Sequence, residues 1–193
     1  NRMSPSQREQ WDKHYDPIIK KFKEYKLTGN ALAEWKYQNY IRDYAAVIRS
    51  VDDNVGRLLD YLEQNGLSDN TIVVYTSDQG FYMGEHGWFD KRFMYEESFH
   101  TPLIISYPGH IKEGVQCHQL VQNIDFAPTF LELAGLKKPA EMSGRSLQPL
   151  FKGDKVKNWR KDLYYHYYDY PTYHLVRKHD GVRNERYKLI HFY

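Results

Sequence analysis

An acid and an amide, Asp78 and Gln79, directly follow a run of β-forming residues, 71–76, at the start of the stretch TIVVYTSDQGFYMGEHGWFDK. Their carboxylate and carbonyl oxygens are hard ligands, which suit Ca²⁺ or Mg²⁺ rather than Zn²⁺. Further along the same stretch, His86 and Lys91 add an imidazole and an ammonium group. A divalent cation with these two groups in one pocket would bind a tetrahedral oxyanion. The types and spacing of these residues therefore predict a metal-assisted oxyanion site.

The residues around Asp78 also have a purely structural interpretation. A strand that ends in Ser-Asp-x-Gly often forms only a turn, in which the Asp side chain hydrogen-bonds its own backbone. The combination of features favours a functional site, because Lys91 stands thirteen positions after Asp78 and three glycines lie between them. Gly80, Gly84 and Gly87 would let the backbone turn sharply and lie close to a ligand.

The elements around this stretch follow the α/β pattern, in which helices alternate with strands. Apolar residues at steps of three and four predict a long helix over 31–65, which ends at Gly66. The runs at 71–76 and 101–108 are continuously apolar, which is typical of strands buried on both faces of a parallel sheet. In such a sheet ligands bind beyond the carboxyl ends of the strands, where the acid–amide pair stands.

The segments on either side are less regular. The first 30 residues predict only helical fragments, including a short helix opened by Pro17. Asp125 is the expected N-cap of a helix that Gly135 ends. The stretch 143–154, SGRSLQPLFKGD, is expected to be a surface loop that closes the domain.

Short β segments are predicted from about residue 158 onward, with a turn at Asp180 and Gly181. His174, Arg177 and His179 alternate with apolar residues there, so we expect them to share one face of a hairpin.

The composition limits the partners of the chain. A formal net charge of +2 gives no basic field that would point to nucleic acid or to an anionic membrane. No apolar run approaches the roughly 18 residues of a membrane span. The single cysteine, Cys117, excludes an internal disulfide, and we interpret it as an ordinary small hydrophobic side chain.

The chain has no initiator Met and stops inside a strand-like run, so we expect it to be part of a longer protein. We expect two domains: residues 1–157 belong to the α/β domain, and residues 158–193 begin the small C-terminal subdomain.

The order of these motifs resembles the C-terminal half of the type I sulfatases, in the alkaline phosphatase superfamily. The resemblance runs from SVDDNVGRLLDYLEQNG through the acid–amide pair, GEHG, the lysine and TPLI to QNIDFAPTFLELAG and GRSLQPLFKG, and it covers about residues 35–155. It implies an α/β fold with a central sheet sandwiched by helices and a small C-terminal antiparallel β subdomain.

The resemblance also implies a reaction, the hydrolysis of a sulfate ester. In the family the nucleophile is a formylglycine made from Cys or Ser in a C/S-x-P-x-R motif, and one Ca²⁺ binds the sulfate, with Mg²⁺ as the alternative. Carried over to this sequence, Asp78 and Gln79 would ligate the metal, and Lys91 would bind the sulfate oxygens. His86 would lie near the sulfate or the leaving oxygen.

Three departures from the family pattern qualify this prediction. Gln79 stands where the family commonly has Asn or His, and the nucleophile motif is absent. The N-terminal Asp-Asp metal pair has no counterpart either, because Asp52 and Asp53 lie on the predicted long helix. The chain is therefore expected to carry half of an active site, to be inactive alone and to need the N-terminal half of the same protein. We expect that protein to be periplasmic or secreted.

The stretch 88–102, WFDKRFMYEESFHTP, resembles sulfatases that act on sulfated sugars, including bacterial enzymes of glycosaminoglycan degradation and N-acetylglucosamine-6-sulfatase-like enzymes. Candidate contacts to a sulfated saccharide are Arg92, His174, Arg177 and His179. A salt bridge from Arg92 to Glu96 or Glu97, and a solvent-facing polar side for the other three, are the structural alternatives.

Two other functions remain open. A phosphodiesterase, phosphonate monoester hydrolase or phosphoglycerate mutase relative would belong to the same superfamily, but such enzymes usually bind Zn²⁺ or Mn²⁺ through His, which the Asp-Gln pair argues against. A noncatalytic carbohydrate-binding module built on the tyrosine-rich tail would bind sugar regardless of Ca²⁺ and of Asp78→Ala.

Overall fold

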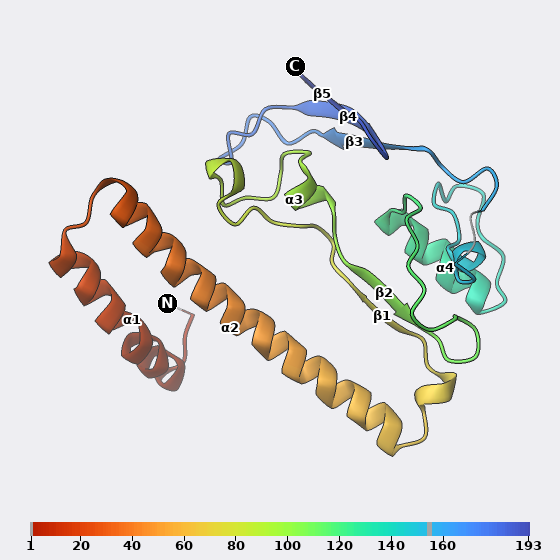
Figure 1. Cartoon of the computed structure of the whole chain (residues 1–193), viewed down its shortest axis with the longest axis horizontal. Helices are drawn as coiled ribbons and strands as arrows, with labels where there is room; N and C mark the ends of the chain where they lie inside the picture. Colours follow the sequence, from red (N-terminus) through yellow and green to blue (C-terminus); the bar gives the residue numbers. More distant parts are fainter. Residues whose placement is uncertain (1, 154–155) are drawn as a thin grey trace. The chain divides into compact units, whose positions relative to one another are not determined.

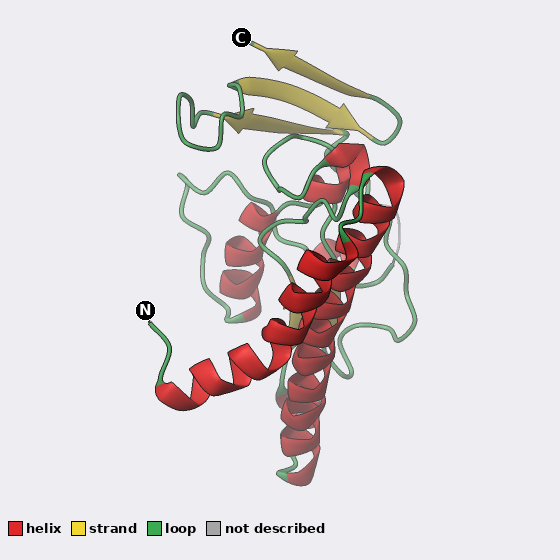
Figure 2. Cartoon of the chain, turned by 90° about the vertical axis from the view of Figure 1, so that its left-hand side faces the viewer, coloured by secondary structure: helices red, strands yellow, loops and turns green. Residues whose placement is uncertain are grey.

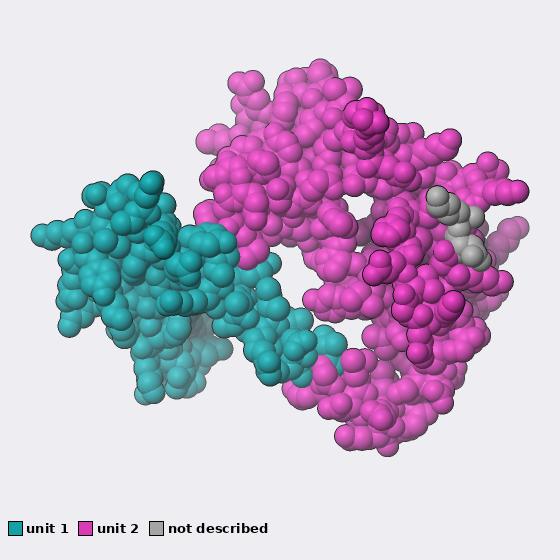
Figure 3. Space-filling view, in the orientation of Figure 1, with its two compact units in different colours: residues 1–55 teal, residues 56–193 magenta. Residues whose placement is uncertain are grey.

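The computed structural model describes residues 2–153 and 156–193. The chain divides into two compact units, residues 1–55 and 56–193 (Figure 3), with the boundary inside a long helix, α2 (Gly29–Gln64). This division differs from the expected domains, 1–157 and 158–193, whose boundary stays a prediction. No helix within the described ranges has the length and apolar character needed to cross a membrane.

The first unit begins with α1 (Pro5–Tyr25), which is one continuous helix where only helical fragments were expected. Ser4 explains why the helix starts early: its hydroxyl accepts from the Gln7 N–H, and the Gln7 side chain accepts from the Ser4 N–H. This reciprocal capping box satisfies two backbone donors, and Pro5 follows at the first helical position. Pro17 lies inside the helix rather than at its start.

The second helix, α2 (Gly29–Gln64), confirms the long helix predicted from the apolar stripe (Figure 1). Gly66 follows it with φ +65°, the left-handed conformation expected of a helix-ending glycine. Asp53 is an exposed residue of α2 and pairs with Arg49 at 2.9 Å, so the Asp52–Asp53 pair is a helix-surface pair and not a metal site.

Side-chain contacts connect the two helices of the first unit, and His14 lies 3.3 Å from Asp43. The Tyr15 hydroxyl donates to Asp43 at 2.9 Å, and the rings of Phe22 and Trp35 lie 5.3 Å apart.

In the second unit, a 3-10 turn (Ser68–Asn70) leads to β1 (Val73–Thr76), which pairs with β2 (Leu103–Ser106). The pairing is antiparallel, with Val73 opposite Ser106 and Thr76 opposite Leu103, so the predicted parallel pairing is wrong. The reason is the connection: residues 77–102 form a returning loop that carries a 3-10 turn (Glu85–Gly87) and a short helix, α3 (Glu96–Phe99), and not the helical crossover typical of parallel strands. Alternate side chains of these strands face solvent here, such as Tyr75 and Ile104.

A 3-10 turn (Asn123–Asp125) leads directly into α4 (Phe126–Leu133), and Gly135 ends it with φ +71°, as predicted. Asp125 precedes the helix but does not cap it. Its carboxylate is fully buried, accepts from the backbone N–H groups of Gln122 and Arg145 at 2.8 Å each, and forms an ion pair with Arg160. Instead of capping the helix, the buried Asp125 carboxylate connects the start of α4 to Arg160, in the segment that leads to the last sheet.

The stretch 143–153 is a loop with several exposed residues, as predicted, but part of it packs into the core. Leu147 and Leu150 are 2% and 6% exposed, the latter in a 3-10 turn (Gln148–Leu150). Gly144 packs so closely on the Ile124 carbonyl that an added Cβ would lie 1.9 Å from its oxygen. Asp154, the last residue of the predicted loop, lies outside the described residues.

The C-terminal sheet contains β3 (Asp162–Tyr167), β4 (His179–Asn184) and β5 (Lys188–Phe192), antiparallel and in that order (Figure 2). The predicted turn at Asp180 and Gly181 is wrong, because both residues lie within the central strand β4. The turn follows Asn184, whose side-chain oxygen accepts from the Arg186 and Tyr187 N–H groups at 2.9 and 2.6 Å. Asn can fix a tight turn in this way without a glycine.

Candidate functional site

Asp78 and Gln79 directly follow β1, and the surrounding structure holds their backbone in place. The Asn123 side-chain amide donates to the Asp78 carbonyl at 2.9 Å, and the Ser77 hydroxyl donates to the Gln79 carbonyl at 2.8 Å. The Asp78 side chain is exposed, and within the described residues its carboxylate forms no ion pair. A fixed backbone with a carboxylate that lacks a cationic partner is suited to bind a ligand.

The glycines of this loop have two different roles. Gly84 and Gly87 have φ +115° and +77°, which confirms the sharp turns predicted there. Gly80 instead packs against the returning chain: an added Cβ would lie 2.0 Å from the Glu97 carbonyl oxygen, and the Gly80 N–H donates to Ser98 at 2.8 Å. Gly80 is thus required for the close contact between the two arms of the loop.

The loop that carries the remaining candidates folds back on itself. The Tyr82 N–H donates to the Asp90 carbonyl at 2.7 Å, and the Gly84 N–H donates to Trp88 at 2.9 Å. Tyr82 is fully buried, and its hydroxyl donates to the Phe93 carbonyl at 2.6 Å. Burial raises the pKa of this hydroxyl, so it remains a donor throughout the physiological range.

His86 is held on the outer part of this loop, in a left-handed conformation with φ +57°. Its Nε2 lies 3.2 Å from Glu97, and its ring stacks on Tyr95 with centroids 4.8 Å apart. The side chain is 44% exposed. An oriented imidazole that solvent can reach is consistent with a role as a donor to a bound ligand.

Lys91 is exposed, and no acidic group of the described residues lies within ion-pair distance of its ammonium group. The neighbouring Arg92 forms an ion pair with Asp90, and its Nη2 lies 2.8 Å from Nε2 of His174. The predicted alternative of a bridge from Arg92 to Glu96 or Glu97 is therefore wrong. Those two carboxylates pair elsewhere, with Arg183 and Lys188 and with His86.

The three tail candidates do not share one hairpin face as predicted. His174 and Arg177 lie in the loop before β4, and His179 is the first residue of that strand. His179 is fully buried and its Nδ1 lies 2.8 Å from the Arg177 carbonyl oxygen. This burial argues against a direct contact with sugar, and the role of His179 stays a prediction. His174 joins Arg92, and Arg177 is exposed.

Sequence reasoning missed Asp90, which pairs with Arg92 on the same loop. The available signal was an acid two positions before the arginine and directly beside the lysine.

The described residues do not complete a metal site by themselves. No group of three or more His, Cys, Asp or Glu side chains is arranged as metal ligands anywhere in residues 2–153 and 156–193. Asp78 and Gln79 offer two hard oxygens, which fit Ca²⁺ or Mg²⁺ in chemistry and leave further positions for ligands from elsewhere.

A hollow of about 490 Å³ lies in the second unit, and Asn123, which donates to the Asp78 carbonyl, is among the residues that line it. Its walls include Thr76, Leu103 and Phe126, together with Cys117, but none of Asp78, Gln79, Lys91 and Arg92. Cys117 is a free and exposed cysteine there, so it is not a core residue, and its interpretation as an ordinary small hydrophobic side chain stays a prediction.

Comparison with known proteins decides the family. The family model described as "Sulfatase" matches residues 7–136. The chain belongs to the sulfatase family. A second model, "N-sulphoglucosamine sulphohydrolase, C-terminal", matches residues 84–193 and so includes the loop from His86 to Arg92 and the C-terminal sheet.

Individual relatives narrow the similarity within the sulfatases. The chain is 53% identical to an N-acetylglucosamine-6-O-sulfatase of Bacteroides thetaiotaomicron, over all of this chain and 35% of that protein. A solved structure of a protein in complex with its substrate D-glucosamine-2-N,6-O-disulfate matches with a TM-score of 0.93 and 52% identity, over all of this chain and 39% of that one. A phosphonate monoester hydrolase from Silicibacter pomeroyi matches with a TM-score of 0.66 and 31% identity, over 74% of this chain and 30% of that one.

These matches confirm the expected sulfatase fold, an α/β fold with small antiparallel sheets. The chain spans about a third of the length of the sulfatase relative that it matches along its whole length. The roles of Asp78, Gln79, His86 and Lys91 remain predictions, because no comparison assigns individual residues.

Proposed function

We propose that the complete protein hydrolyses the 6-O-sulfate esters of glucosamine units in sulfated carbohydrates. The observation that carries this proposal is the contact between Arg92 and His174. It brings a guanidinium group and an imidazole, both able to hydrogen-bond a sugar, next to Lys91. The names of the relatives support the substrate class, since the whole chain is similar to an N-acetylglucosamine-6-O-sulfatase and to a structure solved with a glucosamine disulfate.

Lys91 is proposed to bind the sulfate oxygens. Its ammonium group is exposed and has no acidic partner within the described residues, so it is available to an anion. As the S–O bond breaks, negative charge grows on the leaving oxygen and redistributes over the sulfate oxygens, and a positioned cation stabilises that charge. His86, which Glu97 holds at 3.2 Å, is proposed to donate a hydrogen bond to the sulfate or to the leaving oxygen.

Arg92, Asp90 and His174 are proposed to bind the sugar. A guanidinium group has five N–H donors, and the contacts to Asp90 and His174 engage only part of them. The remaining donors can reach hydroxyl or N-sulfate oxygens of a glucosamine ring. Because Arg92 can only donate, Nε2 of His174 must accept, which leaves Nδ1–H of His174 as a further donor. Arg177 remains a candidate contact to the saccharide because its side chain is exposed.

Asp78 and Gln79 are proposed to supply two oxygen ligands to the metal, with Ca²⁺ preferred and Mg²⁺ as the alternative. When bound, the metal would neutralise the sulfate charge, and a formylglycine from outside this chain would be the nucleophile. The role of this chain is to hold Asp78 in place through Asn123, and the sugar through Arg92.

The test is sulfate release by the purified complete protein, measured by ion chromatography. We expect release from glucosamine 6-sulfate at least about 10²-fold faster than from glucosamine 3-sulfate or N-sulfoglucosamine, since a site built to hydrogen-bond one arrangement rejects others strongly. A phosphonate monoester is the competing substrate, because of the similarity to a phosphonate monoester hydrolase. Faster hydrolysis of the phosphonate than of every sulfated sugar would overturn the proposal.

A further inference from the structure

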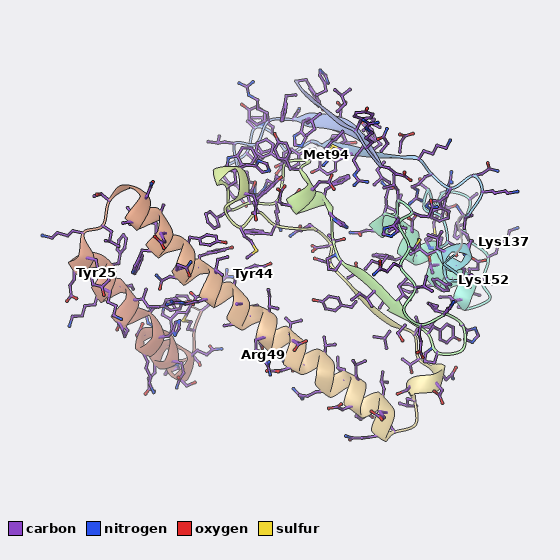
Figure 4. All side chains as sticks on the ribbon, viewed as in Figure 1. Tyr25, Tyr44, Arg49, Met94, Lys137 and Lys152 are labelled. Carbon is purple, nitrogen blue, oxygen red and sulfur yellow. The ribbon has the colours of Figure 1, made fainter. Side chains whose placement is uncertain are left out.

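Met94 joins the site loop to the C-terminal sheet. Its side chain is fully buried and lies over Gly181, a residue of the central strand β4 (Figure 4). An added Cβ at Gly181 would lie 2.6 Å from the Met94 sulfur and 2.5 Å from the Leu189 carbonyl oxygen. Only a glycine at this position of the strand leaves room for the thioether, so the Met94 side chain packs directly against the backbone of Gly181.

The residues on either side of Met94 contact the same sheet. Phe93 stacks on the buried His179 with centroids 5.7 Å apart, and its ring meets Phe192 at 6.0 Å. The Glu96 carboxylate accepts from Arg183 at 3.2 Å and lies 2.5 Å from Lys188. Partial burial raises the pKa of Glu96, but the hydrogen bonds from Lys188 and Arg183 outweigh it and hold the pKa below its ordinary value.

We propose that residues 93–96 are a strap through which the small sheet positions Lys91 and Arg92. Met94 and Glu96 are positioning residues, which touch neither the sulfate nor the sugar. This inference rests on the proposed function, because it assigns the strap a role in presenting the residues that bind the sulfated sugar.

The physical argument is that the site residues lack regular secondary structure of their own. Asp90, Lys91 and Arg92 lie outside every helix and strand, and a loop can hold reacting groups within the tolerance that catalysis requires only if its neighbours are fixed. His174 belongs to the loop that links β3 to β4. A strap that packs on β4 and β5 therefore fixes the position of Arg92 relative to His174.

Met94 is expected to contribute more than Glu96. The thioether is fully buried, whereas the Glu96 carboxylate is 49% exposed and its ion pairs are weakened by solvent.

The experiment compares Met94→Ala, Met94→Leu and Met3→Ala in the complete protein, with Met3 as an exposed control in the first unit. We expect Met94→Ala to lower kcat/KM on glucosamine 6-sulfate by on the order of 10²-fold, because small misplacements of site residues have effects of that size. Met94→Leu, with a similar volume, should restore kcat/KM to within about threefold. Hydrogen exchange of the Tyr82 and Gly84 amides, which bond to Asp90 and Trp88, should accelerate in Met94→Ala only.

Two further variants keep the test decisive. If Met94→Ala does not fold, Glu96→Gln is tested in its place, with Glu132→Gln as the control. We expect kcat/KM to fall roughly tenfold in Glu96→Gln and to stay unchanged in Glu132→Gln. A tenfold loss corresponds to about 1.4 kcal/mol. The strap is overturned if its variants match their controls while Lys91→Ala is inactive. If Lys91→Ala and Arg92→Ala are themselves fully active, the proposed function fails and the strap fails with it.

Discussion

Nη2 of Arg92 lies 2.8 Å from Nε2 of His174, although 82 positions separate the two residues in the chain. A guanidinium group carries no acceptor, so the imidazole must accept through an unprotonated Nε2 and carry its proton on Nδ1. Asp90 pairs with the same guanidinium, which makes Arg92 the centre of a small polar network. Such a network fixes the direction of the remaining Arg92 donors in the free protein.

This network predicts coupled effects on sugar binding. Arg92→Ala and His174→Ala should each raise KM for glucosamine 6-sulfate by about 10- to 100-fold, because lost hydrogen bonds to charged groups cost roughly 1.5–3 kcal/mol. The double variant should be no worse than Arg92→Ala, since both changes remove one shared arrangement. Steady-state kinetics of the three proteins measures this, with the exposed His118→Ala as control. Additive effects would show that the two residues bind the sugar independently.

Lys91→Ala should lower turnover strongly and leave the fold intact. The side chain is exposed and forms no ion pair in the described part of the chain, so little stability depends on it. Removal of one oxyanion donor typically lowers the rate by about 10²–10³-fold. The measurements are kcat on glucosamine 6-sulfate and the unfolding midpoint, with Lys137→Ala, at an exposed position after α4, as control. Near-normal turnover would refute the role of Lys91.

Chelation should remove activity reversibly if Asp78 binds a metal. The complete protein treated with EDTA should regain activity with added Ca²⁺, and Asp78→Ala should need at least about tenfold more Ca²⁺ for half-maximal activity. Asp69→Ala is the control, because Asp69 is an exposed acid just before β1. Full activity of Asp78→Ala in the presence of EDTA would exclude the metal role.

The parts of the fold that the sequence predicted are those set by local pattern. The apolar stripe determined α2, and the left-handed Gly66 and Gly135 ended their helices as expected. The loop glycines Gly84 and Gly87 were predictable for the same reason, because a positive φ excludes most other residues.

The remaining features depend on contacts that no local pattern encodes. An apolar run is compatible with either strand direction, so β1 could not reveal its antiparallel partner. The residue type and position of Asp125 predict a helix N-cap, but its carboxylate pairs with Arg160, which lies 35 positions later in the chain. The candidate site follows the same rule: the positions of Asp78 and Lys91 came from the order of motifs, whereas the contact between Arg92 and His174 required the fold.

The buried pair of Asp125 and Arg160 should be important for stability. Asp125 is fully buried and Arg160 is 10% exposed, so Arg160→Ala would leave an unpaired buried carboxylate. Breaking such a pair typically costs about 3–5 kcal/mol. The exposed pair of Arg8 and Asp12 is the matched control, and Arg8→Ala should cost at most about 1 kcal/mol. Urea unfolding of both variants measures the difference, and equal losses would contradict it.

Tyr165 should make stability depend on pH in the alkaline range. Its hydroxyl donates to the Arg92 carbonyl at 3.0 Å, and burial, followed by the nearby Tyr167, raises its pKa above the ordinary value. Below pH about 10, the ordinary pKa of Tyr, both folded and unfolded states keep the proton and the contribution is complete. Above that pH the unfolded state loses its proton first, so the free energy of unfolding falls until the pH passes the folded pKa.

The variant Tyr165→Phe isolates this effect. At pH 8 it should be less stable by about 1 kcal/mol, the net value of one hydrogen bond. Between pH 9 and 11 its free energy of unfolding should fall less steeply than that of the unmodified protein, because one group with a raised pKa is gone. Tyr61→Phe, at an exposed position of α2, should keep the original slope. Parallel curves for Tyr165→Phe and the unmodified protein would show that Tyr165 does not support the Arg92 segment in the way that its hydrogen bond indicates.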